Sequence, residues 1–178
     1  MNPRLPLLLV AVIATAAATS CSSPPAANEA SCDTGTFDLR ATGSSLGDNA
    51  ALRRAVETTA KAPGTHSLRE LTTTAGWAAG GWDRMAVVTS ATALPAMNQA
   101  IGLPAEYCWQ GLRPVGSDTG VDTYYVFLRG TEPRQAVSPT PSAELFRGLD
   151  GGAVVDAEAR FAGEQNPDNP TKVFLRPA

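Results

Sequence analysis

The side chains able to act as acids, bases or nucleophiles are few and scattered along this chain of 178 residues. His66 is the only histidine, and it follows Pro63 and Gly64, a pair typical of a loop. A serine hydrolase places such a base beside an activated serine, and we expect no serine elbow to accompany His66. His66 is therefore predicted to be a polar surface residue, with a catalytic base as the alternative.

Paired carboxylates are the other route to acid–base catalysis. Glu106, Asp118 and Asp122 are the acidic residues that suggest such a pair, but Asp118 and Asp122 flank Gly120 and are expected to be solvated. We predict no catalytic residue, no metal site and no cofactor, and hence no enzyme. A hydrolase remains an alternative, and it requires that His66 or two carboxylates converge in a cleft.

Two of the three cysteines are predicted to form a disulfide. Cys32 and Cys108 remain as an even pair if Cys21 is modified, and an even pair in an exported chain favours a bridge. This bridge would join the start of the folded domain to its middle. A reactive thiol or a metal site is the alternative, but the chain has one histidine and no Cys-x-x-Cys pattern.

Residues 1–20 have the pattern of a secretory signal, since Arg4 precedes an apolar run over 5–18. That run is too short to cross a bilayer core of about 30 Å as a helix. The segment from Ala18 to Cys21 resembles the lipobox of bacterial lipoproteins. The resemblance implies cleavage before Cys21, a diacylglyceryl thioether on its sulfur that carries acyl chains such as palmitate, and anchoring at the extracytoplasmic face of the cell membrane. Ordinary cleavage after Ala18 is the alternative.

The rest of the chain divides into a tether and one domain. Residues 21–31 are rich in small residues and proline, which is typical of a flexible tether. Residues 32–178 are enough for a single domain with its own core. We expect this part to be a single extracytoplasmic domain of the α+β class.

The stretch from Gly80 to Thr89 is the centre of the predicted fold. A strand over 82–89 would carry apolar residues on both faces, as strands inside a sheet do. Helices are predicted within 44–61, capped by Asp48, and over 90–102, capped by Thr92. Further strands are predicted over 68–74, 107–112, 122–129, 134–138, 153–161 and 171–176. The prediction is a mainly antiparallel sheet of five to seven strands with two short helices packed on it.

Trp82 and Asp83 open the predicted central strand. Asp83 is expected to hold Arg84 or to accept N–H groups from the preceding glycine loop, and contact of Trp82 and Asp83 with a ligand or partner is the alternative. The order of Trp82-Asp83-Arg84, a strand, a short helix ending at Gly102 and an aromatic strand resembles uncharacterised small bacterial envelope proteins. This resemblance covers about 60 residues and carries over no catalytic residue.

Composition restricts the partners. Only 17% of residues are charged and the net charge is −3, so nucleic acid is not an expected partner. Abundant alanine, glycine, proline and threonine with two lysines indicate a GC-rich genome, as in actinobacteria. We predict an envelope lipoprotein, bound to the lipid membrane through acylated Cys21, that binds an envelope protein or small ligand. A carrier of lipid or hydrophobic ligands is an alternative that needs a cavity lined by residues such as Trp82, Met97, Tyr125 or Phe127.

Overall fold

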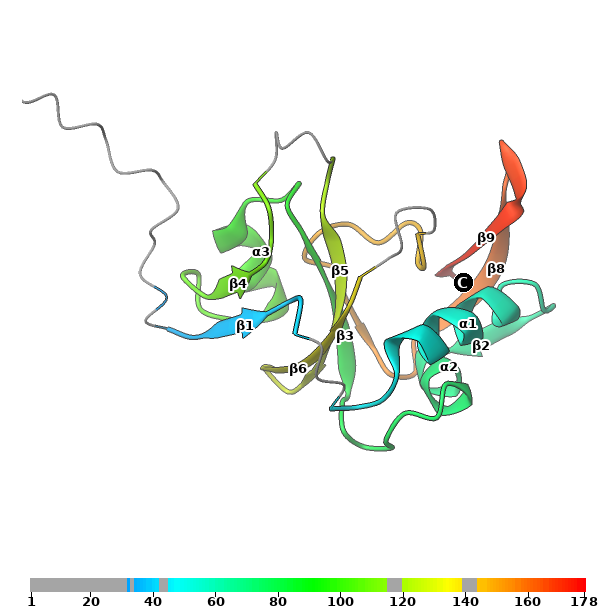
Figure 1. Cartoon of the computed structure of the whole chain (residues 1–178), viewed down its shortest axis with the longest axis horizontal. Helices are drawn as coiled ribbons and strands as arrows, with labels where there is room; N and C mark the ends of the chain where they lie inside the picture. The colour runs from blue at the N-terminus through cyan, green and yellow to red at the C-terminus, as the bar shows by residue number, and fades with distance from the viewer. Residues whose placement is uncertain (1–31, 33, 42–44, 115–119, 139–143) are drawn as a thin grey trace, which may run out of the picture. The chain divides into compact units, whose positions relative to one another are not determined.

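The computed structural model describes residues 32, 34–41, 45–114, 120–138 and 144–178, all within one compact unit that spans 31–178 (Figure 1). The predictions for Cys21, for the tether and for Asp118 fall outside the described residues. The described residues form three helices and nine strands. The α+β class and the predominance of antiparallel pairing are therefore confirmed, but the strands are distributed over three sheets.

The central sheet contains four strands in the order β6-β5-β3-β7. Strand β3 (Arg84–Thr89) lies between β5 (Thr123–Arg129) and β7 (Val154–Asp156), and β6 (Glu132–Val137) pairs with the outer side of β5. All four strands pair antiparallel with their neighbours. The predicted position of β3 inside a sheet is confirmed.

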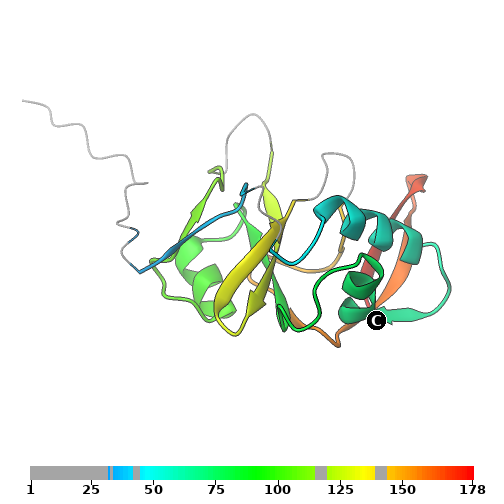
Figure 2. The ribbon, with the colours of Figure 1, turned by 60° about the horizontal axis from the view of Figure 1, so that its bottom comes forward.

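Each face of the central sheet belongs to a different hydrophobic cluster, because alternate residues of a strand point to opposite faces. Met85 and Val87 lie with Phe127 in one cluster, and Ala86 and Val88 lie in the other. Two helices, α1 (Asn49–Thr59) and α2 (Leu68–Thr74), contribute to the first cluster, and α3 (Leu94–Ile101) contributes to the second. Figures 1 and 2 show α1 and α2 on the opposite side of β3 and β5 from α3.

The helix α1 is capped as predicted. The Asp48 carboxylate accepts hydrogen bonds from the N–H groups of Ala50 and Ala51, at 2.8 and 3.2 Å. The cap predicted for α3 is wrong, because its N-cap is Ala93 and makes no side-chain hydrogen bond. Gly102 ends α3 with a φ of 85°, where glycine avoids a steric penalty.

The strand predicted over 68–74 is wrong, since these residues form the helix α2. A capping box begins this helix: the Ser67 hydroxyl accepts from the Glu70 N–H at 3.1 Å, and the Glu70 carboxylate accepts from the Ser67 N–H at 2.7 Å. Leu68 and Leu71 are buried on the same side. The two reciprocal bonds and this apolar face outweigh the modest strand preference of the threonines that follow.

A second sheet has the order β2-β8-β9. Its strands are β2 (Thr65–Ser67), β8 (Arg160–Asn166) and β9 (Asn169–Pro177). The single strand predicted over 153–161 is wrong, because β7 ends at Asp156 and β8 enters a different sheet. The Asp156 side chain accepts from the Glu158 N–H at 2.8 Å, which closes a local turn between the two strands.

The third sheet holds two short strands in parallel, β1 (Thr36–Asp38) and β4 (Cys108–Gln110). They belong to the same side of the central sheet as α3, where Trp109 is buried in the second cluster. β4 confirms the strand predicted there. β1 was not predicted, because three residues show too little periodicity to be recognised.

Candidate functional site

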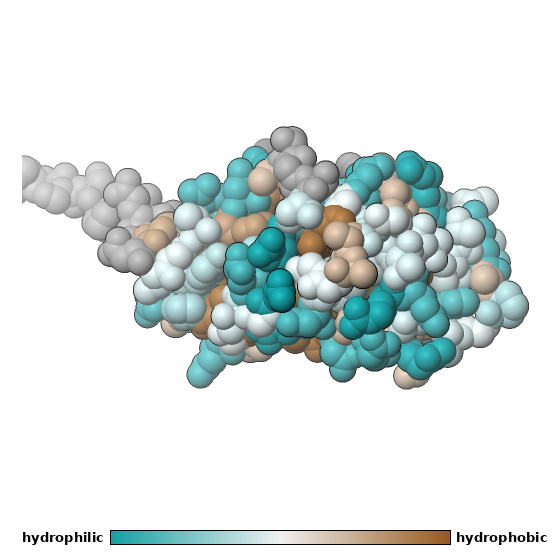
Figure 3. All heavy atoms as spheres, turned by 90° about the horizontal axis from the view of Figure 1, so that it is seen from below, coloured by the Kyte–Doolittle hydropathy of each residue, from teal (hydrophilic) through white to brown (hydrophobic). Residues whose placement is uncertain are grey.

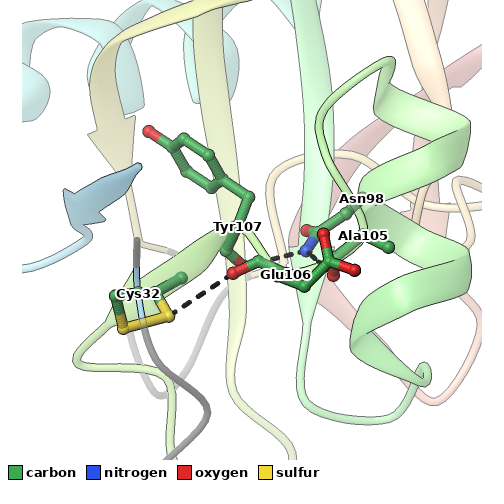
Figure 4. The surroundings of a disulfide bond; sticks show 6 residues. Cys32, Asn98, Ala105, Glu106 and Tyr107 are labelled. Carbon is green, nitrogen blue, oxygen red and sulfur yellow. Dashed lines mark hydrogen bonds between the residues drawn. A yellow bond between two sulfur atoms is a disulfide. The ribbon is translucent and has the colours of Figure 1, made fainter. Parts of the chain in front are cut away.

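The disulfide between Cys32 and Cys108 confirms the predicted pairing, and the two Cα atoms are 5.5 Å apart. It lies where β1 and β4 run side by side, with Thr36 in register with Cys108. Figure 4 shows the bridge beside the carbonyl of Glu106, which is 3.7 Å from the Cys108 sulfur. The bridge therefore fixes the segment that leads into β1.

Asn98 holds the segment before β4 from inside the protein. Its Nδ2 donates to the carbonyls of Ala105 and Tyr107 at 2.9 and 2.8 Å, a pair of bonds drawn in Figure 4. Its Oδ1 accepts from Nε1 of Trp109 at 2.7 Å. Asn98 has no exposed surface and its polar atoms are engaged. We conclude that it positions β4 and is not a free ligand-binding group.

Trp82 packs in the core, whereas Asp83 and Arg84 bind the turn between β5 and β6. Trp82 is buried edge-to-face on Phe127, with ring centroids 5.0 Å apart. The exposed carboxylate of Asp83 accepts from the Gly130 N–H at 2.8 Å, and Nε of Arg84 donates to the Gly130 carbonyl at 2.6 Å. Asp83 thus anchors the backbone, but the predicted partner is wrong, because its carboxylate binds Gly130 and neither Arg84 nor the preceding glycine loop.

His66 is not the exposed loop residue that was predicted. It lies in β2 opposite Phe161 of β8 and is half-buried, because the 65–67 segment pairs with β8. Its Nε2 is buried and has no hydrogen-bond partner in the described part of the chain. No hydrogen bond or ion pair joins either ring nitrogen of His66 to a carboxylate of the described residues, whereas a catalytic base needs such an orienting group.

The expectation that no serine elbow exists is wrong at the level of sequence, since residues 43–47 read Gly-Ser-Ser-Leu-Gly. Ser45 is the central residue of this pattern. Its hydroxyl donates to the Arg134 carbonyl at 2.8 Å, and no hydrogen bond joins it to His66. Among the described residues before Ser45, β1 ends at Asp38 and no strand follows it, whereas a nucleophile elbow is entered from a strand. Ser45 and His66 do not form a nucleophile–base pair.

Asp122 is buried and not solvated as predicted, with 8% of its surface exposed. Nε of Arg113 donates to its Oδ2 at 2.9 Å, and the Arg113 backbone N–H donates to the same atom at 3.1 Å. The hydrogen bonds from Arg113 hold the pKa of Asp122 below its ordinary value, and the more distant charge of Arg40 acts in the same direction. Asp122 is thus neutralised by an arginine and not coupled to a second carboxylate.

A hollow of about 290 Å³ lies where the chain leaves β1 and passes α1, β5 and β6. Its polar lining consists of Arg40, Asn49, Arg53, Tyr124 and Ser138, and the remainder comes from apolar residues beside β1 and in β6. Figure 2 shows the start of α1 beside the end of β6, where two of these elements meet. None of the lining residues is acidic.

Two elements hold the arginines of this hollow. Arg40 follows buried Leu39, whose N–H extends the pairing with β4 by donating to the Gln110 carbonyl at 3.0 Å. The side chain of Arg40 lies against Gly111, where a Cβ atom would stand 3.0 Å from its Cγ. Arg53 projects from α1, and its Nη1 donates to the Ser138 carbonyl at 2.9 Å.

The charges of Arg40 and Arg53 are not compensated by direct ion pairs. Neither arginine forms a salt bridge with an acidic residue of the described ranges. Asp38 accepts from the backbone N–H of Arg40 at 2.8 Å and not from its guanidinium group. The hollow therefore presents positive charge and hydrogen-bond donors, an arrangement suited to anions.

The residues proposed for a hydrophobic-ligand cavity do not share one space. Trp82, Tyr125 and Phe127 pack in the first cluster, whereas Met97 packs in the second, across the central sheet. All four are buried in these clusters. Trp77 and Trp109 are also core residues.

The surface offers little apolar area in the described residues, since Leu94 and Val121 are the large hydrophobic side chains with high exposure there. On the face in Figure 3, strongly hydrophobic atoms form small spots among hydrophilic ones. The described residues hold no group of three or more potential metal ligands. They also contain no helix long and apolar enough to cross a bilayer.

Comparison with known proteins found no relative. No family model, no curated protein and no solved structure matches the chain.

The sequence analysis did not predict the hollow, because Arg40 and Arg53 come from separate elements. The one available signal is the four-residue spacing of Asn49 and Arg53, which places both side chains on one face of α1.

Proposed function

We propose that the protein is an envelope lipoprotein, anchored to the membrane through Cys21, whose folded unit is a non-enzymatic binding module. The observation that carries the binding function is the hollow in which Arg40 and Arg53 stand without a direct carboxylate partner. A binding site needs polar groups left available to the ligand, and here they converge from α1 and from the end of β1.

The proposed location is supported by two features that are independent of the hollow. The lipobox-like segment ends at Cys21, and the bridge between Cys32 and Cys108 suits an oxidising extracytoplasmic compartment. Residues 22–31, which are rich in small residues and proline, would join Cys21 to the folded unit. The folded unit would then work close to the lipid surface, and two or more acyl chains would hold it there stably.

The experiment is native mass spectrometry of the full chain, extracted from its own membrane in mild detergent. We expect a chain that begins at Cys21, carries acyl groups and lacks two hydrogens at Cys32 and Cys108. Retained mass from a partner or small ligand would identify what it binds. The control is Cys21→Ser, which should lose the acyl mass and leave the membrane fraction. An unacylated wild-type chain beginning near Thr19 would contradict the anchor.

A further inference from the structure

We propose that the hollow between Arg40 and Arg53 is a binding site for a phosphate ester. This inference rests on the proposed binding function and names its ligand class. The site is assembled from four parts of the fold, namely the end of β1, the first turns of α1, the start of β5 and the end of β6. Each part contributes at least one polar side chain, so a ligand in the hollow would be contacted from several sides.

The hydrogen-bond inventory favours an anion over a cation or a neutral ligand. An arginine side chain has five N–H donors and no acceptor. Arg53 donates one of these N–H groups to the Ser138 carbonyl, and the guanidinium group of Arg40 makes no hydrogen bond to the described residues. The hydroxyl groups of Tyr124 and Ser138 likewise have no protein partner there. With no carboxylate in the lining, the available groups are mostly donors.

The number of donors separates phosphate from carboxylate. A carboxylate has two oxygens, which a single guanidinium fork already engages in a bidentate pair. The two guanidinium groups and two hydroxyls of the hollow offer more donors than the two oxygens of a carboxylate can accept. A phosphate ester presents three strong acceptor oxygens and a larger negative charge, so it can use both forks and a hydroxyl. The donor set therefore matches phosphate better.

The nearby acidic groups of the described residues do not form ion pairs with Arg40 or Arg53, so both guanidinium groups remain able to bind an anion. Two carboxylates lie near Arg40: Asp38 accepts from its backbone N–H at 2.8 Å, and Asp122 is held by Arg113 through the side-chain and backbone bonds described above. On α1, the neighbouring Arg54 contacts Asp48 at 3.7 Å, which keeps the capping carboxylate engaged outside the hollow. The hollow thus keeps a local positive charge in a chain whose net charge is −3.

The size of the hollow indicates an ester and not the bare ion. Its volume of about 290 Å³ is near the lower end for small-molecule pockets, which hold about 300–1,000 Å³. A water molecule occupies about 30 Å³ of liquid, so an inorganic ion alone would leave space around it. Leu39 and Ala136 supply apolar surface beside the arginines, where the carbon part of an ester can lie. A soluble phosphoester and a lipid phosphate group share this chemistry.

The test is calorimetric titration of the full chain in detergent with three probes: glycerol phosphate, dihexanoyl phosphatidylglycerol and acetate. The variants are Arg40→Gln and Arg53→Gln, and the matched control is Arg54→Gln. Arg54 neighbours Arg53 on α1 and its loss changes the net charge equally, but it does not line the hollow. Circular dichroism confirms that each variant is folded, and Arg40→Gln removes no side-chain hydrogen bond of the described protein.

We expect saturable binding of at least one phosphoester, weaker binding of acetate, and a loss of about tenfold or more for each hollow variant. Arg54→Gln should bind as the wild type does. Tighter binding of the dihexanoyl lipid would assign the site to a lipid phosphate, whereas equal or tighter binding of glycerol phosphate would assign it to a soluble ester. No saturable phosphoester binding, or an equal loss in Arg54→Gln, would overturn the proposal.

This titration separates the inference from the broader proposal. An unacylated chain can still bind glycerol phosphate through the hollow, in which case the anchor fails and the site stands. Conversely, a partner protein found in the native mass spectrum together with no phosphoester binding would leave the anchored binding module intact and remove the ligand class.

Discussion

The side-chain Nδ2 of Asn49 donates to the carbonyl oxygen of Ala136 at 2.9 Å, so that α1 covers the outer edge of β6. Two further bonds of 2.8 and 2.9 Å follow the same pattern along this edge. The three donor–acceptor pairs are Ser45 with Arg134, Asn49 with Ala136, and Arg53 with Ser138. Side chains four residues apart thus engage carbonyls two residues apart.

The two spacings agree because helix and strand advance by similar distances. Four helical residues rise about 6 Å, and two strand residues rise about 6.6–6.8 Å. Asn49 and Arg53 lie within α1, so their side chains follow the strand like a second ladder. An unpaired edge is a template for another strand, and here its outward carbonyls are occupied. The same arrangement places Arg53 at the hollow.

Replacing Asn49 by alanine should weaken this edge. The substitution leaves the carbonyl of buried Ala136 without its side-chain donor, and it removes one of the two bonds donated by Nε2 of Gln135, which keeps the Gly47 carbonyl. We expect a loss of about 1–3 kcal/mol in the free energy of unfolding. We also expect concentration-dependent self-association, measured by sedimentation velocity beside urea denaturation.

Arg54→Ala is the control for the edge variant, because Arg54 and its partner Asp48 are both exposed. Such a surface pair contributes about 0–1 kcal/mol, so little change is expected. If Asn49→Ala and Arg54→Ala lose the same stability and both stay monomeric, the edge bonds do not protect β6.

The sequence predicts best those parts of the fold whose signals are local. Asp48 caps α1 as expected, and the apolar run after Trp82 gives the central strand, because few neighbours are needed for either signal. The α2 error is also local: Ser67 and Glu70 have the spacing of a capping box, but the threonine-rich segment was interpreted as a strand. The strand preference of threonine was therefore given more weight than the capping box of Ser67 and Glu70.

The candidate site depends on contacts that no local signal reports. Arg40 reaches the hollow only because β1 pairs in parallel with β4, and Arg53 only because α1 lies along β6. Asp122 was expected to be solvated, yet it is buried and bonded to Arg113, which precedes it in the sequence. These relationships follow from the register of strands that are distant in sequence, which composition and spacing do not determine.

Asp122 should make the protein sensitive to acid. Its folded-state pKa lies below the unfolded value of about 3.9, so its stabilising contribution is present above pH 4 and is lost as pH falls through the folded-state pKa. Asp122→Asn should cost about 1–3 kcal/mol at neutral pH, since it removes hydrogen bonds to a charged group. Urea denaturation should show that the difference in unfolding free energy between wild type and Asp122→Asn is smaller below pH 4 than at neutral pH.

Glu106→Gln is the matched charge control for Asp122, because Glu106 is exposed and its carboxylate forms no ion pair with the described residues. It should change stability little at any of these pH values. A difference between wild type and Asp122→Asn that stays constant from neutral to acid pH would argue against the ion pair as the source of acid sensitivity.

Gly163 should not tolerate alanine, because β8 passes against the end of α1. A Cβ atom there would stand 2.1 Å from the carbonyl oxygen of Ala60, which is backbone and cannot rotate away. We expect Gly163→Ala to lose about 1–3 kcal/mol or more in urea denaturation. In the control Gly81→Ala, the atom met at 2.6 Å is Cδ2 of Leu46, the end of a flexible side chain, so the loss should be smaller. Equal losses would mean that β8 shifts freely.

Tyr125 should limit stability at high pH. Its hydroxyl donates to the Phe146 carbonyl at 3.1 Å and accepts from the Phe146 N–H at 3.2 Å, and the side chain is 2% exposed. Burial raises the pKa of Tyr125 to about 12, against about 10 in an unfolded chain. The stabilising contribution is complete below pH 10 and is lost as pH rises through 12, by on the order of 2–3 kcal/mol.

Tyr125→Phe tests this assignment because it removes the ionising group and keeps the ring that packs on Phe146 with centroids 5.0 Å apart. The variant should be about 1–3 kcal/mol less stable at neutral pH, since the backbone of Phe146 loses both hydrogen bonds to the Tyr125 hydroxyl. Its stability should then fall less steeply than that of the wild type between pH 10 and 12. Tyr124→Phe retains Tyr125 and should keep the steep fall. If the stabilities of wild type and Tyr125→Phe fall in parallel between pH 10 and 12, another group causes the alkaline loss of stability. In that case the ultraviolet absorbance of ionised tyrosine would show Tyr125 titrating like an exposed residue.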